Sequence, residues 1–193
     1  MARALLPRRW HCCCVTETLQ RRVFFALWPD DQARAALDAL AAQGAKRCGG
    51  RCVLRENLHL TLAFIGAVSQ QQLDLLQQLA AGVVGDAYDL QLDRLGYWSR
   101  SRILWAGCSM PPPAHDRLVA ALGGLLAAAG FQLEKRPHLP HMTLVRQAHC
   151  RDLPVIDQPV KWHVSGFSLV ESSLQPAGAT YHTLARWPLR GSV

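Results

Sequence analysis

The stretch NLHLTLAFIG, residues 57–66, places a histidine and a threonine two positions apart within an otherwise apolar run. Because side chains alternate across a strand, we expect His59 and Thr61 to project from one face, while the neighbouring leucines and Phe64 project from the other. The stretch therefore predicts a strand with one packed face and one face that holds an imidazole beside a hydroxyl on a rigid element.

A second stretch, LPHMTLVR at residues 139–146, repeats this arrangement with His141 and Thr143. Chance would place only about 0.25 such pairs in a chain of this composition, and here both pairs are followed by leucine. Each copy also belongs to a unit of strands and helix. We interpret the repeat as a duplicated half-domain, whose pseudo-two-fold axis places the two His-Thr pairs across a shared groove.

The rest of the chain continues this alternation of strands and helices. Strands are predicted at 21–29, 57–65, 87–98, 102–109, 141–146, 161–172 and 180–189, and helices at 30–43, 69–83 and 111–130. Ser69 is suited to cap the second helix, and Gly130 to end the third. The pattern predicts the α+β class: a bilobal duplicated fold with two mostly antiparallel sheets flanked by helices and an active-site groove between the lobes.

Composition limits the size and partners of this fold. A chain of 193 residues that is 50% hydrophobic and 18% charged can bury one sizeable core, so we expect a single bilobal domain at 21–193. The formal net charge of +7 favours a polyanionic partner such as nucleic acid. The excess of arginine over lysine could instead reflect coding composition, so charge alone does not identify the partner.

Residues 1–20 contain basic residues but no apolar run long enough for a signal peptide. We expect them to be a disordered extension or an overlong start. No other segment reaches the ~18 uninterrupted apolar residues that a membrane span needs. These features predict a cytoplasmic protein with no membrane partner, and we expect it to be a monomer.

Seven cysteines are distributed without the spacing of a disulfide framework or of paired zinc knuckles. They stand at positions 12, 13, 14, 48, 52, 108 and 150. We therefore expect reduced thiols. A metal site formed by Cys48, Cys52 and His59 is conceivable, but no second Cys pair completes it, and we reject it.

Both His-Thr stretches resemble a known family. ENLHLTLAFIG at 56–66 and RPHLPHMTLVR at 136–146 are similar to the two signature motifs of the 2H phosphoesterases, in the branch of RNA 2′,3′-cyclic phosphodiesterases once called 2′-5′ RNA ligases. RRVFFALWP, YWSRSRILWAGC and FSLVESSLQPAGATYHTLARWPL resemble further strands of that family, so the similarity covers about residues 21 to 190. It implies an enzyme that hydrolyses RNA 2′,3′-cyclic phosphate ends, with a 2′-phosphate as the expected product.

The chemistry of such a ring opening suits the residues present. Water must lose a proton as it attacks phosphorus, and the departing ribose oxygen must gain one, which two histidines can provide near neutral pH. The resemblance implies that His59 is the acid and His141 the base, with Thr61 and Thr143 binding the non-bridging phosphate oxygens. The scheme requires no metal and no cofactor. Joining of RNA ends through a 2′-5′ linkage in the same site, and an RNA-binding module without turnover, remain alternatives.

Two further residues stand five positions after each histidine, Phe64 and Arg146. The resemblance implies that Phe64 lies beside the nucleotide and Arg146 at the phosphate. Strict alternation would turn both away from the histidine face, so a bulge or the strand's end must redirect them. A core aromatic and a surface ion pair are the alternatives for these two residues. Arg136 is a weaker phosphate candidate, and we assign His138 no role.

The remaining candidates have simpler interpretations. The other histidines, His11, His115, His149, His163 and His182, are interpreted as surface or packing residues. The tryptophans are more typical of a core than of a platform for stacked bases. Gly49 and Gly50 lack the strand, helix and Lys-Ser/Thr ending of a phosphate loop.

Overall fold

The computed structural model describes residues 20–134, 136–175 and 178–191. The predicted extension at 1–20 therefore lies outside the described residues except for Gln20, and its disorder stays a prediction. In chain order the elements are β1 (Arg21–Leu27), α1 (Asp31–Cys48), β2 (Arg51–Cys52), the 3-10 helix η1 (Arg55–Asn57), β3 (Leu60–Val68), α2 (Gln70–Ala81), β4 (Tyr88–Leu92), β5 (Arg94–Trp98), β6 (Ile103–Gly107), α3 (Pro113–Ala128), β7 (His141–Arg146), β8 (Val160–Val164), β9 (Gly166–Gln175) and β10 (Gly178–Pro188).

The strands form two antiparallel sheets, so the predicted α+β class is confirmed. The larger sheet has the order β10-β9-β1-β3-β7-β6-β5, with β2 paired to β7, and the smaller one consists of β4 and β8. The two strands that carry the His-Thr pairs, β3 and β7, are neighbours in the larger sheet. They meet at one residue pair, Leu60 opposite Met142. Each of these residues directly follows one of the two histidines, so the halves of the sheet join at equivalent points.

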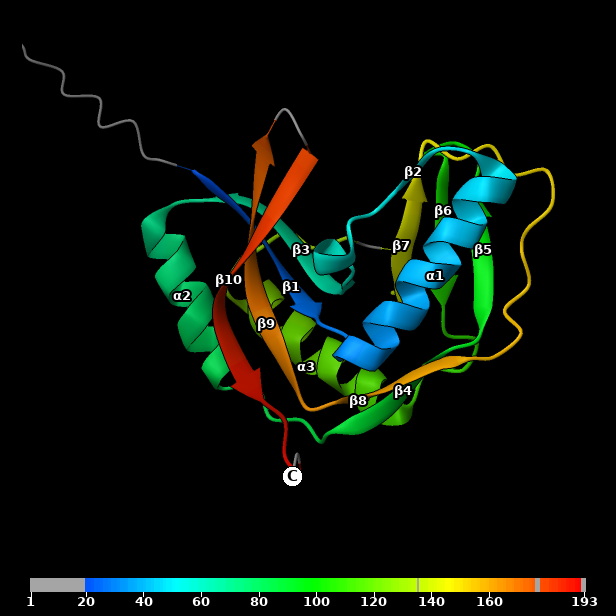
Figure 1. Cartoon of the computed structure of the whole chain (residues 1–193). Helices are drawn as coiled ribbons and strands as arrows, with labels where there is room; N and C mark the ends of the chain where they lie inside the picture. The colour runs from blue at the N-terminus through cyan, green and yellow to red at the C-terminus, as the bar shows by residue number, and fades with distance from the viewer. Residues whose placement is uncertain (1–19, 135, 176–177, 192–193) are drawn as a thin grey trace, which may run out of the picture.

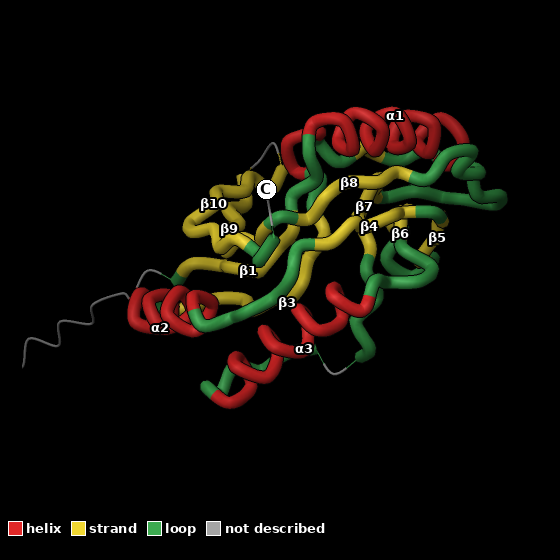
Figure 2. The backbone as a smooth tube through the Cα atoms, turned by 90° about the horizontal axis from the view of Figure 1, so that it is seen from below, coloured by secondary structure: helices red, strands yellow, loops and turns green. Residues whose placement is uncertain are grey.

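The packing of the helices follows from their apolar faces. Figures 1 and 2 show α1 on one side of the strands, over β7, and α2 and α3 on the opposite side. Leu60 and Met142, where the halves join, are fully buried, and burying an apolar side chain of this size contributes about 1.5–3 kcal/mol. The junction that sets the spacing of the two histidines is thus anchored in the core.

Within the described residues, no helix combines the length and the apolar character needed to cross a membrane.

Most predicted elements are present, and local signals explain their ends. The Ser69 hydroxyl accepts a hydrogen bond from the backbone N–H of Gln72, and the Gln72 side-chain oxygen accepts one from the backbone N–H of Ser69. This is the predicted cap of α2. The first helix extends beyond its predicted end to Cys48. His59 lies one residue before β3 instead of within it.

Two predicted strands are wrong because each is two strands in different sheets. The predicted strand 87–98 is divided at Asp93, where β4 ends and pairs with β8 while β5 begins and pairs with β6. The Asp93 carboxylate accepts a 2.8 Å hydrogen bond from the backbone of Ser109, which stabilises the corner. The predicted strand 161–172 is likewise divided at Ser165 into β8 and β9. In both stretches the apolar alternation moves from even to odd positions at the division, a signal that the sequence analysis did not use.

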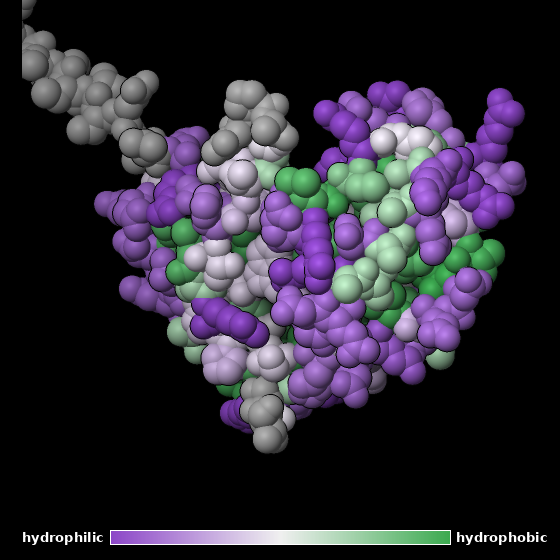
Figure 3. Space-filling model, viewed as in Figure 1, coloured by the Kyte–Doolittle hydropathy of each residue, from purple (hydrophilic) through white to green (hydrophobic). Residues whose placement is uncertain are grey.

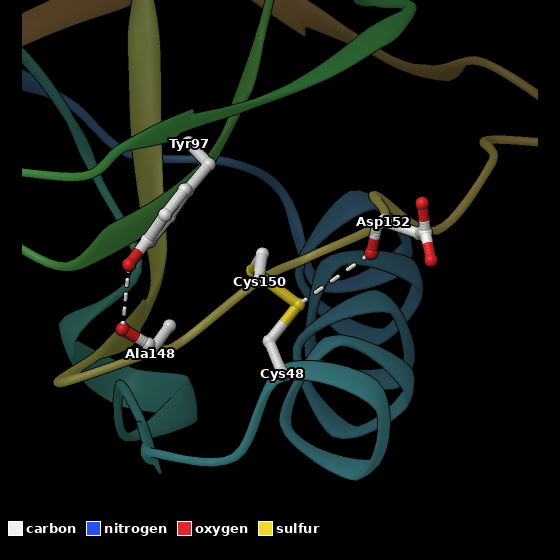
Figure 4. Close-up of a disulfide and its surroundings, with 5 residues drawn as sticks. All are labelled: Cys48, Tyr97, Ala148, Cys150 and Asp152. Carbon is white, nitrogen blue, oxygen red and sulfur yellow. Dashed lines mark hydrogen bonds between the residues drawn. A yellow bond between two sulfur atoms is a disulfide. The ribbon is translucent and has the colours of Figure 1, made fainter.

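The expectation of reduced thiols is wrong for one pair. Cys48, the last residue of α1, forms a disulfide with Cys150 in the loop after β7 (Figure 4). Their Cα atoms lie 4.4 Å apart although 102 positions separate them in the sequence. Only the packing of α1 against β7 brings them together, so cysteine spacing could not indicate the pair. Among the described cysteines, Cys52 is an exposed free thiol and Cys108 a buried one.

Candidate active site

The two His-Thr pairs lie in one pocket, together with both residues that stand five positions after the histidines. The pocket has a volume of about 240 Å³. Its lining consists of Phe24, His59, Thr61, Phe64, Trp98, Ile103, His141, Thr143, Arg146, Ser172 and Tyr181. The space-filling view shows the molecule hollowed at its upper edge between the two halves (Figure 3). All six residues predicted for the site are therefore brought together by the fold.

Both histidines are oriented by the same local hydrogen bond. The Nδ1 atom of His59 lies 2.7 Å from the carbonyl oxygen of Asn57, and that of His141 lies 2.8 Å from the carbonyl oxygen of Leu139. A carbonyl oxygen can only accept, so Nδ1 carries the hydrogen in each ring. The Nε2 atom of each neutral ring is then left with a free lone pair. Both rings are thereby prepared to exchange a proton through Nε2.

The side chain of Asn57 holds this carbonyl in place on the β3 side. Its amide nitrogen donates a 2.8 Å hydrogen bond to the carbonyl oxygen of Ala179, and the residue is only 9% exposed. Asn57 thus connects η1 with β10, while its own carbonyl accepts from His59. The sequence analysis did not identify this residue, because its partner is more than a hundred positions away.

Aromatic rings enclose His59 and lower its pKa. The ring centres of Phe24, Tyr181 and Trp28 lie 4.8, 5.0 and 5.6 Å from that of the imidazole. Burial lowers the pKa of His59 to about 4, and the positive charges of Arg146 and His141 act in the same direction, against the hydrogen bond to Asn57. Without a bound anion, His59 is therefore neutral at neutral pH.

His141 has a similar environment on the other half of the sheet. Trp98 and Trp105 place their ring centres 4.7 and 6.3 Å from its imidazole, and burial lowers the pKa of His141 as well. Trp105 can lie there because Gly96 on the neighbouring strand has no side chain; a Cβ atom at that position would collide with the indole ring. Trp98 lines the pocket, whereas Trp105 is 7% exposed and supports it from the core, as the sequence analysis expected of the tryptophans.

A bulge in β3 turns Phe64 toward the pocket. Thr61 and Ala63 are paired with consecutive residues of β1, so Leu62 between them has no partner. An extra residue of this kind resets the alternation of side chains. Phe64 consequently shares the pocket with Thr61 and is 51% exposed, which excludes the alternative of a core aromatic.

An equivalent bulge in β7 turns Arg146 the same way. Thr143 and Val145 are paired with consecutive residues of β6, which leaves Leu144 without a partner on that strand. Leu144 and Val145 are both buried, and Arg146 is exposed at the pocket. Each bulge falls one residue after a threonine. The change of direction expected from the sequence for the side chains of Phe64 and Arg146 therefore occurs at matching positions in both halves.

The charged candidates differ in their surroundings. Arg146 takes part in none of the ion pairs between described residues, so its charge is available to an anion in the pocket. Arg136 instead pairs with Glu134 at 2.7 Å on an exposed loop and does not line the pocket. The geometry therefore favours Arg146 over Arg136 as a phosphate ligand.

A second pair of histidines joins α3 to the loop that leads into β7. His115 is fully buried, and its Nδ1 atom lies 2.8 Å from the hydroxyl oxygen of Tyr88. His138, to which the sequence analysis gave no role, stacks on His115 with ring centres 5.4 Å apart. Burial lowers the pKa of His115 to about 4. The stack therefore anchors the loop that contains Leu139, the hydrogen-bond partner of His141.

Other pocket residues were missed because their position depends on strand register. Phe24, Ser172 and Tyr181 come from β1, β9 and β10, and Ile103 from β6. Their local sequences are ordinary strands, and only the pairing of those strands brings them to the histidines. Across the described part of the chain, no three His, Cys, Asp or Glu side chains converge in a way that could hold a metal ion.

Comparison with known proteins gives a consistent result. A family model described as LigT-like phosphoesterase matches residues 27–105. The RNA 2′,3′-cyclic phosphodiesterase of Escherichia coli K12 is 34% identical over 170 residues, which cover 88% of this chain and 97% of that protein. The protein of the same name from Thermotoga maritima is 27% identical, over 89% of this chain and 97% of its own length.

Solved structures show the same fold. The crystal structure of E. coli LigT complexed with 3′-AMP matches with a TM-score of 0.83 at 34% identity, covering 89% of this chain and 99% of that one. The structure of TT0787 from Thermus thermophilus matches with a TM-score of 0.77 at 28% identity, covering 89% of this chain and 100% of that one.

Proposed function

Because this chain belongs to the LigT-like branch of the 2H phosphoesterases, we propose that it hydrolyses RNA 2′,3′-cyclic phosphate ends to a phosphomonoester. The observation that carries this proposal is the pair of histidines in one pocket, each with Nδ1 bound to a carbonyl oxygen and Nε2 left for proton exchange. Relatives from E. coli and T. maritima are named for this activity. A complex of the E. coli protein with 3′-AMP supports a nucleotide as the ligand.

The reaction needs one proton to be taken and one to be given. In our proposal, Nε2 of neutral His141 accepts a proton from the attacking water as the new P–O bond forms. Nε2–H of protonated His59 gives a proton to the ribose oxygen as its bond to phosphorus breaks. The protonation states of the two rings are then exchanged, and solvent restores them. The carbonyl oxygens of Asn57 and Leu139 stabilise each ring while it is charged.

The negative charge of the substrate phosphate favours the protonated form of His59, which the free site does not favour. The pKa of His59 is about 4 without a ligand, but a phosphate anion between the rings favours the imidazolium, so binding promotes protonation of the acid. Thr61, Thr143 and Arg146 are positioned to bind the non-bridging oxygens, where negative charge grows in the transition state. Phe64 offers an exposed ring to the nucleoside. Loss of the 3′-oxygen from phosphorus gives the expected 2′-phosphate.

The test uses purified protein and a labelled RNA oligonucleotide that ends in a 2′,3′-cyclic phosphate. We expect ring opening to a monoester that phosphatase removes, unchanged by EDTA because the scheme uses no metal. His59→Ala and His141→Ala are each expected to lose most of this activity. Binding without turnover would indicate an RNA-binding module, and joined RNA in the presence of a second end with a free 5′-hydroxyl would indicate ligation.

The proposal also includes a monomer that acts in the cytoplasm. Size-exclusion chromatography with light scattering is expected to give the mass of one chain, 21.3 kDa. Both histidines and both threonines of the pocket come from one molecule, so the proposed chemistry needs no second copy.

A further inference from the structure

A row of four residues crosses the sheet at one end of the pocket. Arg51 on β2 is the partner of Arg146 on β7, Arg146 is the partner of Ile103 on β6, and Ile103 is the partner of Trp98 on β5. Residues directly opposite on neighbouring strands project from the same face. Arg146, Ile103 and Trp98 all line the pocket. Arg51 therefore projects from the pocket face, one strand beyond Arg146.

The place of Arg51 is fixed by the backbone before it. Gly50 has a φ of +93°, and a Cβ atom there would lie 2.5 Å from the carbonyl oxygen of Arg146 and 2.9 Å from the nitrogen of Ala148. Glycine thus allows β2 to approach β7 closely. After the strand, the backbone of Val53 donates a 2.8 Å hydrogen bond to the carbonyl oxygen of Leu144. Gly50 therefore allows Arg51 to lie beside Arg146.

The Cys48–Cys150 disulfide joins the segment before Arg51 to the segment after Arg146. Cys48 lies three residues before Arg51, and Cys150 lies four residues after Arg146. The backbone of His149 also donates a 2.7 Å hydrogen bond to the carbonyl oxygen of Cys48. The segments on both sides of the arginine pair are therefore tied to each other, which limits how far the two backbones can separate.

The charges of this pair are uncompensated within the described residues. Arg51 and Arg146 are both exposed, and neither belongs to the ion pairs that the described side chains form. Like charges placed directly opposite on neighbouring strands destabilise a sheet. A phosphate beside each arginine would offset both charges and reduce this repulsion, and phosphate suits the planar fork of an arginine. The pair thus favours a ligand with more than one phosphate.

We propose that Arg51 binds a second phosphate of the substrate, the phosphodiester on the 5′ side of the terminal nucleotide. This inference rests on the proposed function and names its substrate class: RNA of two or more nucleotides, in preference to a cyclic mononucleotide. The cyclic phosphate occupies the histidine pocket with Arg146. Arg51 is one strand away, a spacing of ~5 Å between backbones, and its long side chain extends the phosphate site beyond the pocket.

The experiment compares two substrates, 2′,3′-cyclic AMP without a 5′-phosphate and the dinucleotide ApA ending in a 2′,3′-cyclic phosphate. Wild-type protein is expected to have the higher kcat/KM with the dinucleotide. We consider the ratio of kcat/KM for the dinucleotide to kcat/KM for the mononucleotide. Arg51→Gln is expected to lower this ratio roughly tenfold, because it removes a hydrogen bond between charged groups. Arg47→Gln, the same change of charge at an exposed position on α1, is the matched control and is expected to keep the wild-type ratio.

A second substrate tests the same contact without changing the protein. In this substrate, a dinucleotide, a neutral methylphosphonate replaces the charged internal linkage. Wild-type protein is expected to have a kcat/KM roughly tenfold lower with it than with the charged dinucleotide, and Arg51→Gln is expected to lower kcat/KM for it no further. With longer RNA, Arg51→Gln is expected to reduce the slope of log kcat/KM against log salt by about 0.7, the value for one phosphate contact on a single strand.

The outcomes separate the inference from the proposed function. If wild-type protein opens neither substrate, the proposed function is wrong. If it opens both and Arg51→Gln leaves their ratio unchanged, the second phosphate site is refuted while the function stands. An equal loss on both substrates would place Arg51 at the terminal phosphate and would also refute the second site.

Discussion

The lowered pKa values of the two histidines predict that kcat/KM declines at neutral and alkaline pH. The proposed mechanism needs one ring protonated and the other neutral, so only the singly protonated pair is active. Burial lowers the pKa of His59 from 6.5 to about 4 and also lowers that of His141. Both apparent pKa values of the coupled pair in the free enzyme therefore lie below 6.5.

The size of the effect follows from these limits. A rise in pH through the upper of the two values removes the one proton that the active form requires. Beyond it, kcat/KM falls tenfold per pH unit. If the alkaline limb begins at 6.5 or lower, kcat/KM at pH 8 is at least about 30-fold below its maximum. The bound phosphate anion raises both pKa values, so the alkaline limb of kcat is expected at higher pH than that of kcat/KM.

The assay follows hydrolysis of a 2′,3′-cyclic mononucleotide from pH 4 to pH 9, first far below KM and then at saturation. Circular dichroism at each pH confirms that the protein stays folded. A kcat/KM that is flat or rises between pH 6.5 and pH 8 would refute the reasoning, because it would require a free enzyme in which the acid keeps its proton at neutral pH. If the alkaline limbs of kcat and kcat/KM coincide, the bound phosphate does not raise the pKa values of the two histidines.

Three further predictions concern the phosphate ligand, the buried histidine and the disulfide. Arg146→Ala is expected to lower kcat/KM at least tenfold without lowering the melting temperature, since Arg146 is exposed at the pocket and is proposed to bind the phosphate; wild-type kcat/KM would show it to be an ordinary surface charge. Tyr88→Phe is expected to cost about 1–3 kcal/mol in urea unfolding, because it leaves Nδ1 of buried His115 unpaired; an unchanged midpoint would mean that water replaces the hydroxyl. Reduction of the Cys48–Cys150 disulfide is expected to cost about 4.7 kcal/mol, as for a closed loop of about 100 residues; identical unfolding curves with and without reductant would contradict this value.

The sequence predicts the part of the site that depends on local order. Alternation places His59 with Thr61, and His141 with Thr143, on the same strand faces, and the repeat brings the two pairs into one pocket. The position of Phe64 and Arg146 five residues further on requires a bulge, and both bulges are present. These features involve neighbours along the chain, whose relative directions the backbone geometry determines.

The parts that escape prediction depend on which distant segments pack together. Tyr181 reaches His59 because β10 pairs with β9 and β9 with β1, and no local pattern indicates that order. The change of sheet at Asp93 depends on the pairing of β4 with the distant β8, while β5 pairs with β6. The disulfide joins residues that are adjacent only because α1 packs on β7. Register and packing of this kind are tertiary properties, and a single sequence does not show them.

The two-histidine mechanism is tested most directly by kcat for the opening of a 2′,3′-cyclic phosphate in four proteins: wild type, His59→Ala, His141→Ala and the double variant. If the two rings act together at one phosphate, each single change removes most of the rate, and the double variant is little slower than either one. A double variant whose loss is the product of the two single losses would show that the rings act independently. A single variant with the wild-type kcat would remove that histidine from the mechanism.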